Sequence, residues 1–185
     1  MILGNPAESG TDLAVALVNT WDTYDDPPEH LPDVANLRRF LRIVGRERAA
    51  RTAGEQELAE VRRLRGQLRR VFETDDAAEA ASALNEILAA VNAVPRLEAD
   101  DGRWAIRFGP EEQAIAAHLG ATAAAALAEI VRAHGVSRFG ICSAPPCTGA
   151  FVDRTKNRSK RYCCELCADR AAQQHHRARR RAGRR

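Results

Sequence analysis

Residues 142–167 read CSAPPCTGAFVDRTKNRSKRYCCELC, and this stretch holds all five cysteines of the 185-residue chain. Four residues lie between Cys142 and Cys147, three lie between Cys163 and Cys167, and fifteen residues separate the two pairs. Such spacing is typical of a structural zinc site, because each pair supplies two thiolates from one turn and zinc takes four at about 2.3 Å. The stretch therefore predicts one tetrahedral Zn²⁺ site.

The fifth cysteine leaves one ligand open. Cys164 and Cys167 form a C-x2-C pair that suits zinc equally well, so spacing alone does not choose between Cys163 and Cys164. Catalytic zinc is disfavoured, because an open site normally recruits histidine or a carboxylate and no such pattern accompanies the cysteines. We expect a structural ion rather than a catalytic one.

The cellular compartment of the protein influences whether its cysteines bind metal or form disulfides. The first ten residues contain no basic stretch, and the apolar run 13–18 is too short for a signal peptide or a membrane span. We therefore expect a cytoplasmic protein without a membrane segment. In that reducing environment clustered cysteines bind metal more often than they form disulfides.

The residues around the cysteines predict a treble-clef arrangement of knuckle, hairpin and helix. Residues 144–146 suit a knuckle turn, and strands are expected at 150–154 and 160–162. Cys163 and Cys167 are one helical turn apart, so both thiolates can face the metal from the first turn of a final helix.

The preceding residues have mainly helical periodicity. Apolar positions at spacings of three and four predict five helices, with Asp12 and Asp33 as N-caps and Gly45 and Gly135 as terminators. The expected helices cover residues 12–20, 33–44, 55–73, 77–94 and 111–134. Alternating apolar residues around Asp101-Gly102 predict a β-hairpin. We predict an α+β protein: a mainly helical domain with a small hairpin sheet at residues 1–135, then a zinc module with a basic C-terminal helix at 136–185.

The charge is unevenly distributed between these two parts. Residues 136–185 carry 13 Lys and Arg against three acidic residues, a net of +10, whereas residues 1–135 carry a net of −7. This asymmetry predicts that the C-terminal part binds a nucleic acid. The expected contact residues are Arg154, Lys156, Arg158, Lys160, Arg161, Arg170 and Arg177.

Double-stranded DNA is the favoured form of nucleic acid. Arginine binds phosphate bidentately and reaches guanine edges. Single-stranded binding usually needs stacking aromatics, and Tyr162 and Phe151 are expected to pack inside so small a module.

From Cys142 onward the sequence resembles the CGNR-type zinc finger, a treble-clef-like module. Eight residues match that family's motif: Phe151, Asp153, Arg154, Asn157, Arg158, Lys160, Arg161 and Tyr162. An aromatic residue followed by cysteine marks the family's third ligand, so the resemblance implies Cys163 rather than Cys164. The naming motif is altered, because this chain reads Cys167, Ala168, Asp169, Arg170.

The part before the finger is similar to the ABATE domain, and its clearest mark is residues 17–20, Leu-Val-Asn-Thr. This resemblance implies a stress-related transcription regulator whose N-terminal domain senses a ligand, with Asn19 and Thr20 as pocket residues. The family often has an acidic residue and an aromatic where Ala16 and Leu17 stand here. A structural role for Asn19 at the end of the first helix is the alternative to a ligand contact.

The function expected from the sequence is a regulator that binds DNA through a zinc finger. The alternative is an RNA-associated or protein-interaction zinc module. We expect no enzyme, because no phosphate loop, nucleophile elbow or metal-binding helix is recognisable in residues 1–135.

Overall fold

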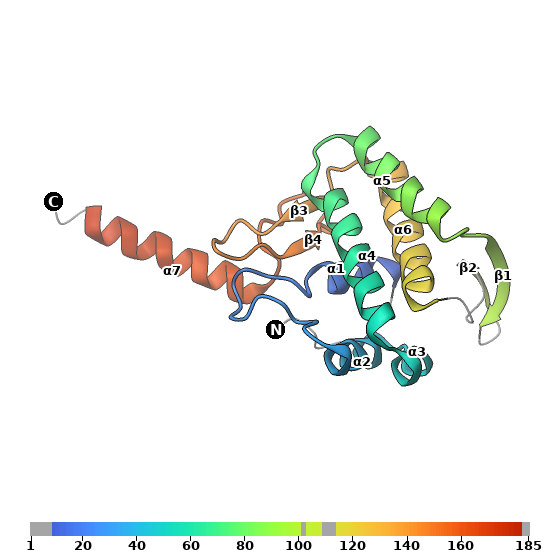
Figure 1. Cartoon of the computed structure of the whole chain (residues 1–185). Helices are drawn as coiled ribbons and strands as arrows, with labels where there is room; N and C mark the ends of the chain where they lie inside the picture. The colour runs from blue at the N-terminus through green and yellow to red at the C-terminus, as the bar shows by residue number, and fades with distance from the viewer. Residues whose placement is uncertain (1–8, 101–102, 109–113, 183–185) are drawn as a thin grey trace.

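The computed structural model describes residues 9–100, 103–108 and 114–182. The described residues form seven helices and two antiparallel two-stranded sheets (Figure 1). The elements are α1 (Gly10–Val18), α2 (Val34–Ile43), α3 (Glu47–Thr52), α4 (Glu55–Glu73), α5 (Ala77–Ala90), β1 (Pro95–Asp100), β2 (Arg103–Phe108), α6 (Ile115–His134), β3 (Phe139–Ile141), β4 (Ala150–Val152) and α7 (Glu165–Ala182).

Helices α1, α4, α5 and α6 pack on one another and build the main core. Their buried faces carry the predicted apolar residues, among them Leu17, Leu68 and Leu127, which are fully buried. The alanine-rich α6 comes close to its neighbours: a Cβ on Gly120 would lie 3.3 Å from side-chain atoms of both Leu64 and Ile87. Small residues thus let α6 approach α4 and α5 closely.

Capping explains where the first helices begin and end. Ser9 caps α1, because its Oγ accepts a hydrogen bond from the backbone N–H of Asp12 at 3.2 Å. The prediction that Asp12 caps this helix is therefore wrong, and Asp12 lies in the first turn. Asp33 caps α2 as predicted, accepting from the Asn36 N–H at 2.8 Å. Gly45, at φ 73°, follows its end.

Several predicted helix boundaries differ from the structure, and α1 covers residues 10–18 rather than 12–20. Helix α5 ends at Ala90 rather than at 94, because Asn92 adopts a φ of 46° and the Ala93 N–H bonds back to the Leu88 carbonyl. Helix α6 begins at Ile115, and most of the predicted first turn, residues 111–113, lies outside the described residues.

Helix α6 also has the length and apolar composition of a membrane-spanning segment, as the only such helix among the residues that the structure describes. A core helix passes the same test. Leu119, Ala123 and Leu127 of α6 are buried against α1, α4 and α5, so its apolar face is occupied within the domain.

The β1–β2 hairpin has the predicted position and extends from one end of the domain (Figure 1). Asp100 pairs with Arg103, and the predicted turn at Asp101-Gly102 lies outside the described residues. Its apolar side chains do not enter the core, because Leu97 and Trp104 remain 64% and 72% exposed.

The second hairpin joins the strand predicted at 150–154, which is β4 at 150–152, to an unexpected partner. β4 pairs with β3, which precedes the first cysteine, in a register that joins Gly140 to Phe151. The prediction of a strand at 160–162 is wrong, since these residues form no strand and the Arg161 carbonyl accepts one hydrogen bond from the Ser143 N–H at 2.9 Å. Residues 142–149 therefore form the loop of the hairpin.

The β3–β4 hairpin packs on the helical domain. Phe139 of β3 contacts Phe72 of α4 with ring centroids 5.3 Å apart, and Ala150 of β4 belongs to the main core. A second, smaller core contains Cys142, Cys147 and Cys167 together with Ala171 of α7. The hairpin is thus shared between the helical domain and the cysteine cluster.

Candidate metal centre and nucleic-acid surface

The fold brings four cysteines together from two segments, the β3–β4 loop and the start of α7. Cys142 follows β3, Cys147 lies in the hairpin loop, Cys163 precedes α7 and Cys167 lies in the first turn of α7. Their sulfur atoms all lie within 4.8 Å of one another. The Cys163 sulfur is 3.6 Å from that of Cys147 and 3.7 Å from that of Cys167. A tetrahedral Zn²⁺ with bonds of about 2.3 Å separates its sulfurs by about 3.8 Å, so these four cysteines fit one structural zinc ion.

Backbone groups shape the cluster. The Gly149 N–H donates to the Cys147 sulfur at 3.3 Å, and the Cys142 N–H donates to the Gly149 carbonyl at 2.8 Å. A Cβ at Gly149 would lie 3.0 Å from the Cys163 sulfur, closer than an ordinary contact. Glycine at this position therefore leaves the space that the thiolates of Cys147 and Cys163 occupy.

Cys164 lies outside the set of four. Its sulfur is 3.9 Å from that of Cys163, and its carbonyl accepts the first helical hydrogen bond of α7, from the Ala168 N–H. Cys163 therefore precedes α7, and the prediction that Cys163 and Cys167 share its first helical turn is wrong for Cys163. The ligand set that the resemblance implied is nevertheless the one that converges.

Burial is the largest influence on the pKa values of the four clustered thiols. It raises the pKa of Cys147, Cys163 and Cys167 above the ordinary value. Burial acts on Cys142 in the same direction, but hydrogen bonds from the backbone N–H groups of Cys163 and Ala144 outweigh it and lower the pKa of Cys142. Zinc binding has to displace protons from these thiols and thereby stabilises the thiolates.

The loop after α1 contacts the β3–β4 loop, residues 142–149, which carries Cys142 and Cys147. The Asp22 carboxylate accepts hydrogen bonds from the backbone N–H groups of Thr148, at 2.9 Å, and Tyr24, at 3.0 Å. The Cys147 thiol donates to the same carboxylate at 3.2 Å. Burial raises the pKa of Asp22, but these hydrogen bonds outweigh it, so the net shift is downward. Asp22 therefore fixes the loop of the zinc module against the helical domain.

Two more side chains of the helical domain contact the same loop. The Thr23 hydroxyl donates to the Pro146 carbonyl, and Arg69 of α4 donates to the Thr148 carbonyl at 3.0 Å. These contacts could not be predicted from a local sequence pattern, because each joins residues far apart in the chain through a backbone carbonyl.

The predicted basic residues lie in two groups, and the first is on the loop between β4 and α7. The buried Asp153 organises this loop by accepting hydrogen bonds from the Thr155 N–H at 2.7 Å and the Lys160 N–H at 2.8 Å. The exposed cations of the loop are Arg154, Lys156, Arg158, Lys160 and Arg161. Of these, Arg154 forms an ion pair with Asp12 of α1, at 2.6 Å.

The second group lies on α7, and its two predicted residues differ. Arg177 is exposed, as are Arg179 and Arg180 beside it. Arg170 is half-buried: its guanidinium donates to the Ala144 carbonyl at 2.6 Å and lies 4.0 Å from the ring centroid of Tyr24. Arg170 thus fixes the start of α7 against the β3–β4 loop, through Ala144.

The two predicted pocket residues have separate surroundings. The Asn19 amide donates to the Ala150 carbonyl at 2.9 Å and accepts from the Ala150 N–H at 2.7 Å. Thr20 is buried, and its hydroxyl donates to the Leu17 carbonyl and accepts from Arg65. Asn19 also borders a cavity, whereas Thr20 does not.

A four-cysteine cluster at the start of a basic helix, docked on a helical domain, defines a zinc-finger protein. Two family models match the chain. Residues 138–180 match the CGNR zinc finger, and residues 11–134 match ABATE, described as "Putative stress-induced transcription regulator". The chain belongs to the ABATE family, and neither matching family is a family of enzymes. A search of curated proteins found no match.

Proposed function

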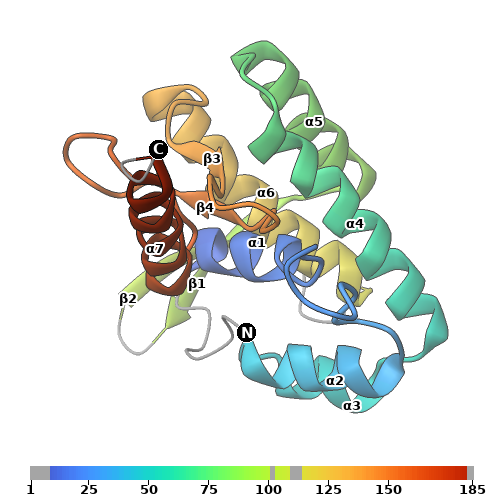
Figure 2. The ribbon, with the colours of Figure 1, turned by 90° about the vertical axis from the view of Figure 1, so that its left-hand side faces the viewer.

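We propose that this protein is a transcription regulator whose zinc module binds double-stranded DNA and whose helical domain carries a ligand signal to that module. The observation that supports DNA binding is the cationic helix α7, which starts at the zinc ligands and projects away from the body of the molecule (Figures 1 and 2).

The free part of α7 has the dimensions for a major groove. The helix contains 18 residues, so it is about 27 Å long. The major groove is about 12 Å wide and admits an α-helix. Beyond Ala171, the described side chains of α7 are exposed through Arg180, so the helix has no packing partner of its own there. Phosphates on both sides of a groove would supply counter-charges for its arginines.

The loop before α7 adds a second cationic segment. Lys156, Arg158 and Arg161 are exposed on a loop that Asp153 and the zinc cluster keep in place. Cations on an ordered scaffold bind phosphates without the entropy loss of ordering a mobile tail. The helical domain is net acidic, so the zinc module is the face that a polyanion approaches.

The aromatic residues of the module favour duplex over single-stranded nucleic acid. Phe151 is buried, and Tyr162 packs against the cysteine core. Because single-strand binding usually depends on exposed rings that stack on bases, these two residues offer little for it.

The test measures binding of the zinc-loaded chain to a random-sequence DNA duplex, a single strand and a structured RNA hairpin by fluorescence anisotropy. The double variant Arg158→Gln/Arg161→Gln should weaken duplex binding by roughly tenfold or more, since it removes two phosphate contacts. Arg39→Gln/Arg51→Gln removes the same charge from exposed positions of the helical domain and should change binding little.

Three outcomes separate the alternatives. Duplex binding lost only in the Arg158/Arg161 variant supports the proposal. Preference for the RNA hairpin would support an RNA-associated module instead. Absence of binding to any of the three probes at low salt would overturn nucleic-acid binding and leave a protein-interaction module.

A further inference from the structure

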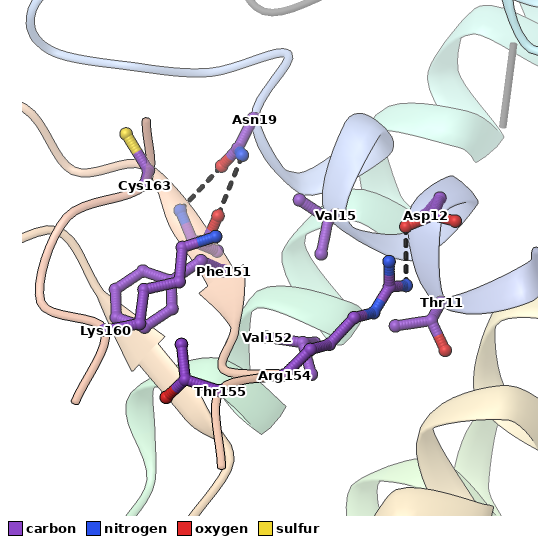
Figure 3. A pocket seen from close by; sticks show the side chains of 11 residues that line it. Thr11, Asp12, Val15, Asn19, Phe151, Val152, Arg154, Thr155, Lys160 and Cys163 are labelled. Carbon is purple, nitrogen blue, oxygen red and sulfur yellow. Dashed lines mark hydrogen bonds and ion pairs between the residues drawn. The ribbon is translucent and has the colours of Figure 1, made fainter. Parts of the chain in front are cut away.

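A cavity of about 370 Å³ lies between α1 and the zinc module (Figure 3). Asp12, Val15 and Asn19 line it from the side of α1, and residues of β4 and the following loop line the other side. Its volume falls in the range of small-molecule sites. Any ligand there would contact the helical domain and the zinc module at once.

The cavity combines an apolar surface with cationic groups. Val15, Phe151 and Val152 supply the apolar surface, and Arg154 and Lys160 supply two positive charges. Among the described residues that line the cavity, Asp12 is the one acidic residue, and it pairs with Arg154 at 2.6 Å.

Lys160 differs from Arg154, whose charge is paired with that of Asp12. Its ammonium lies 5.3 Å from the centroid of the Phe151 ring, and it forms no ion pair within the part of the chain that the structure describes. One positive charge beside an apolar wall suits a ligand with an anionic group and a small hydrophobic body.

We propose that this cavity binds a small organic carboxylate. Its carboxylate pairs with Lys160 and can compete with Asp12 for Arg154, while its apolar body packs on Val15 and Phe151. A neutral amide of the same shape forms no ion pair with Lys160 and binds more weakly. Inorganic phosphate lacks the apolar body and leaves the hydrophobic surface exposed to water.

This ligand would act on the nucleic-acid surface directly, an extension that rests on the proposed function. Arg154 and Lys160 belong to the cations proposed to contact DNA, and a bound carboxylate neutralises Lys160. Carboxylate and DNA then compete, and each lowers the affinity for the other by the same factor. The cavity thus gives the helical domain a route to oppose DNA binding.

The experiment titrates the zinc-loaded full chain with benzoate, phenylacetate and hexanoate, each beside its amide, at constant ionic strength. Binding is followed by amide chemical-shift changes in NMR spectra. We expect saturable binding of at least one carboxylate, at least tenfold weaker binding of its amide, and about tenfold weaker carboxylate binding in Lys160→Gln. Lys156→Gln is the matched control, because Lys156 lies on the same loop but does not line the cavity.

Three results would overturn the inference: no saturable binding of any of the three carboxylates, equal affinity for carboxylate and amide, or equal losses in Lys160→Gln and Lys156→Gln. Phosphate binding as tight as the best carboxylate would also overturn it, since charge alone would then suffice. Separate measurements of DNA binding and carboxylate binding distinguish the two proposals. Carboxylate binding without DNA binding refutes only the proposed function, whereas DNA binding without carboxylate binding refutes only the proposal that the cavity binds a carboxylate.

Discussion

The side-chain amide of Asn19, at the end of α1, forms two hydrogen bonds with the backbone of Ala150 in β4, one as donor and one as acceptor. The Asn19 amide thus satisfies both backbone groups of Ala150, as the backbone of a neighbouring β-strand would. Together with Asp22 at Thr148, it joins the zinc module to the helical domain through directed bonds. The two parts therefore form one packed unit, and these contacts are the route by which the proposed ligand signal would reach the zinc module.

Asn19→Ala tests this connection. It removes both bonds and leaves the buried backbone groups of Ala150 without their partner, so the free energy of unfolding should fall by about 1–3 kcal/mol. Urea denaturation measures the loss, and hydrogen exchange at Ala150 should accelerate. Asn36→Ala, which removes an exposed hydrogen bond to Asp33, should cost less. Equal losses in the two variants would mean that the Asn19 contact has no special role.

The ligand set predicts different outcomes for adjacent cysteines. Elemental analysis should find one zinc per chain in the wild type and in Cys164→Ser, because the Cys164 sulfur lies outside the set of four. Cys163→Ser should lose most of the metal, because serine is a far poorer zinc ligand than thiolate. Zinc retained by Cys163→Ser but lost by Cys164→Ser would reverse the assignment.

The helices could be predicted from the sequence because their signals are local. The apolar residues of α4, from Leu58 to Phe72, repeat at helical spacing, and the predicted bounds 55–73 match the structure. The N-cap at Asp33 could likewise be predicted, because the capping bond joins it to Asn36, three residues further on. Such features need no knowledge of the rest of the fold.

The hairpin of the zinc module and its docking could not be predicted in the same way. β3 and β4 have three residues each, too few for a pattern, and Gly140 accommodates a Phe151 ring that only the folded chain brings near. The Asp22–Thr148 contact joins residues 126 apart. The cysteine set was predictable from spacing except for the choice at Cys163, which the resemblance supplied.

The ion pair between Glu29 and Arg65 predicts a pH-dependent stability. The two terminal nitrogens of the Arg65 guanidinium each donate to the Glu29 carboxylate at 2.7 Å. This pair anchors to α4 the loop that contains Asp22. Burial raises the pKa of Glu29, but the bonds from Arg65 and the Leu31 N–H outweigh it, so the pKa lies below 4.5. The carboxylate's stabilisation is therefore present near neutral pH and is lost as the pH falls through this lowered pKa.

Glu29→Gln should accordingly lower the free energy of unfolding by about 1–3 kcal/mol at pH 7, less than for a fully buried pair. The difference from the wild type should shrink below pH 4.5, measured by urea denaturation at several pH values. Loss of zinc in acid affects both proteins and largely cancels. Glu129→Gln, at an exposed pair with Arg132, is the control. A difference that stays constant with pH would argue against the ion pair.

The salt dependence of DNA binding should separate contacting arginines from structural ones. Arg177→Gln should reduce the slope of log affinity against log salt by about 0.9, because it removes one phosphate contact. Arg170 is engaged with Ala144 and Tyr24, so Arg170→Gln should lower the melting temperature and leave the slope nearly unchanged. A full change of slope in Arg170→Gln without loss of stability would show that this guanidinium contacts DNA instead.

Selection of bound sequences from a random duplex library is the sharpest test of the proposal that the zinc-anchored basic helix and loop recognise duplex DNA. We expect the zinc-loaded chain to enrich a reproducible site at near-physiological salt, and Arg158→Gln/Arg161→Gln to weaken binding to that site. A library that stays random after repeated selection, with binding that disappears as salt rises, would contradict the proposal, because charge alone would then account for all binding.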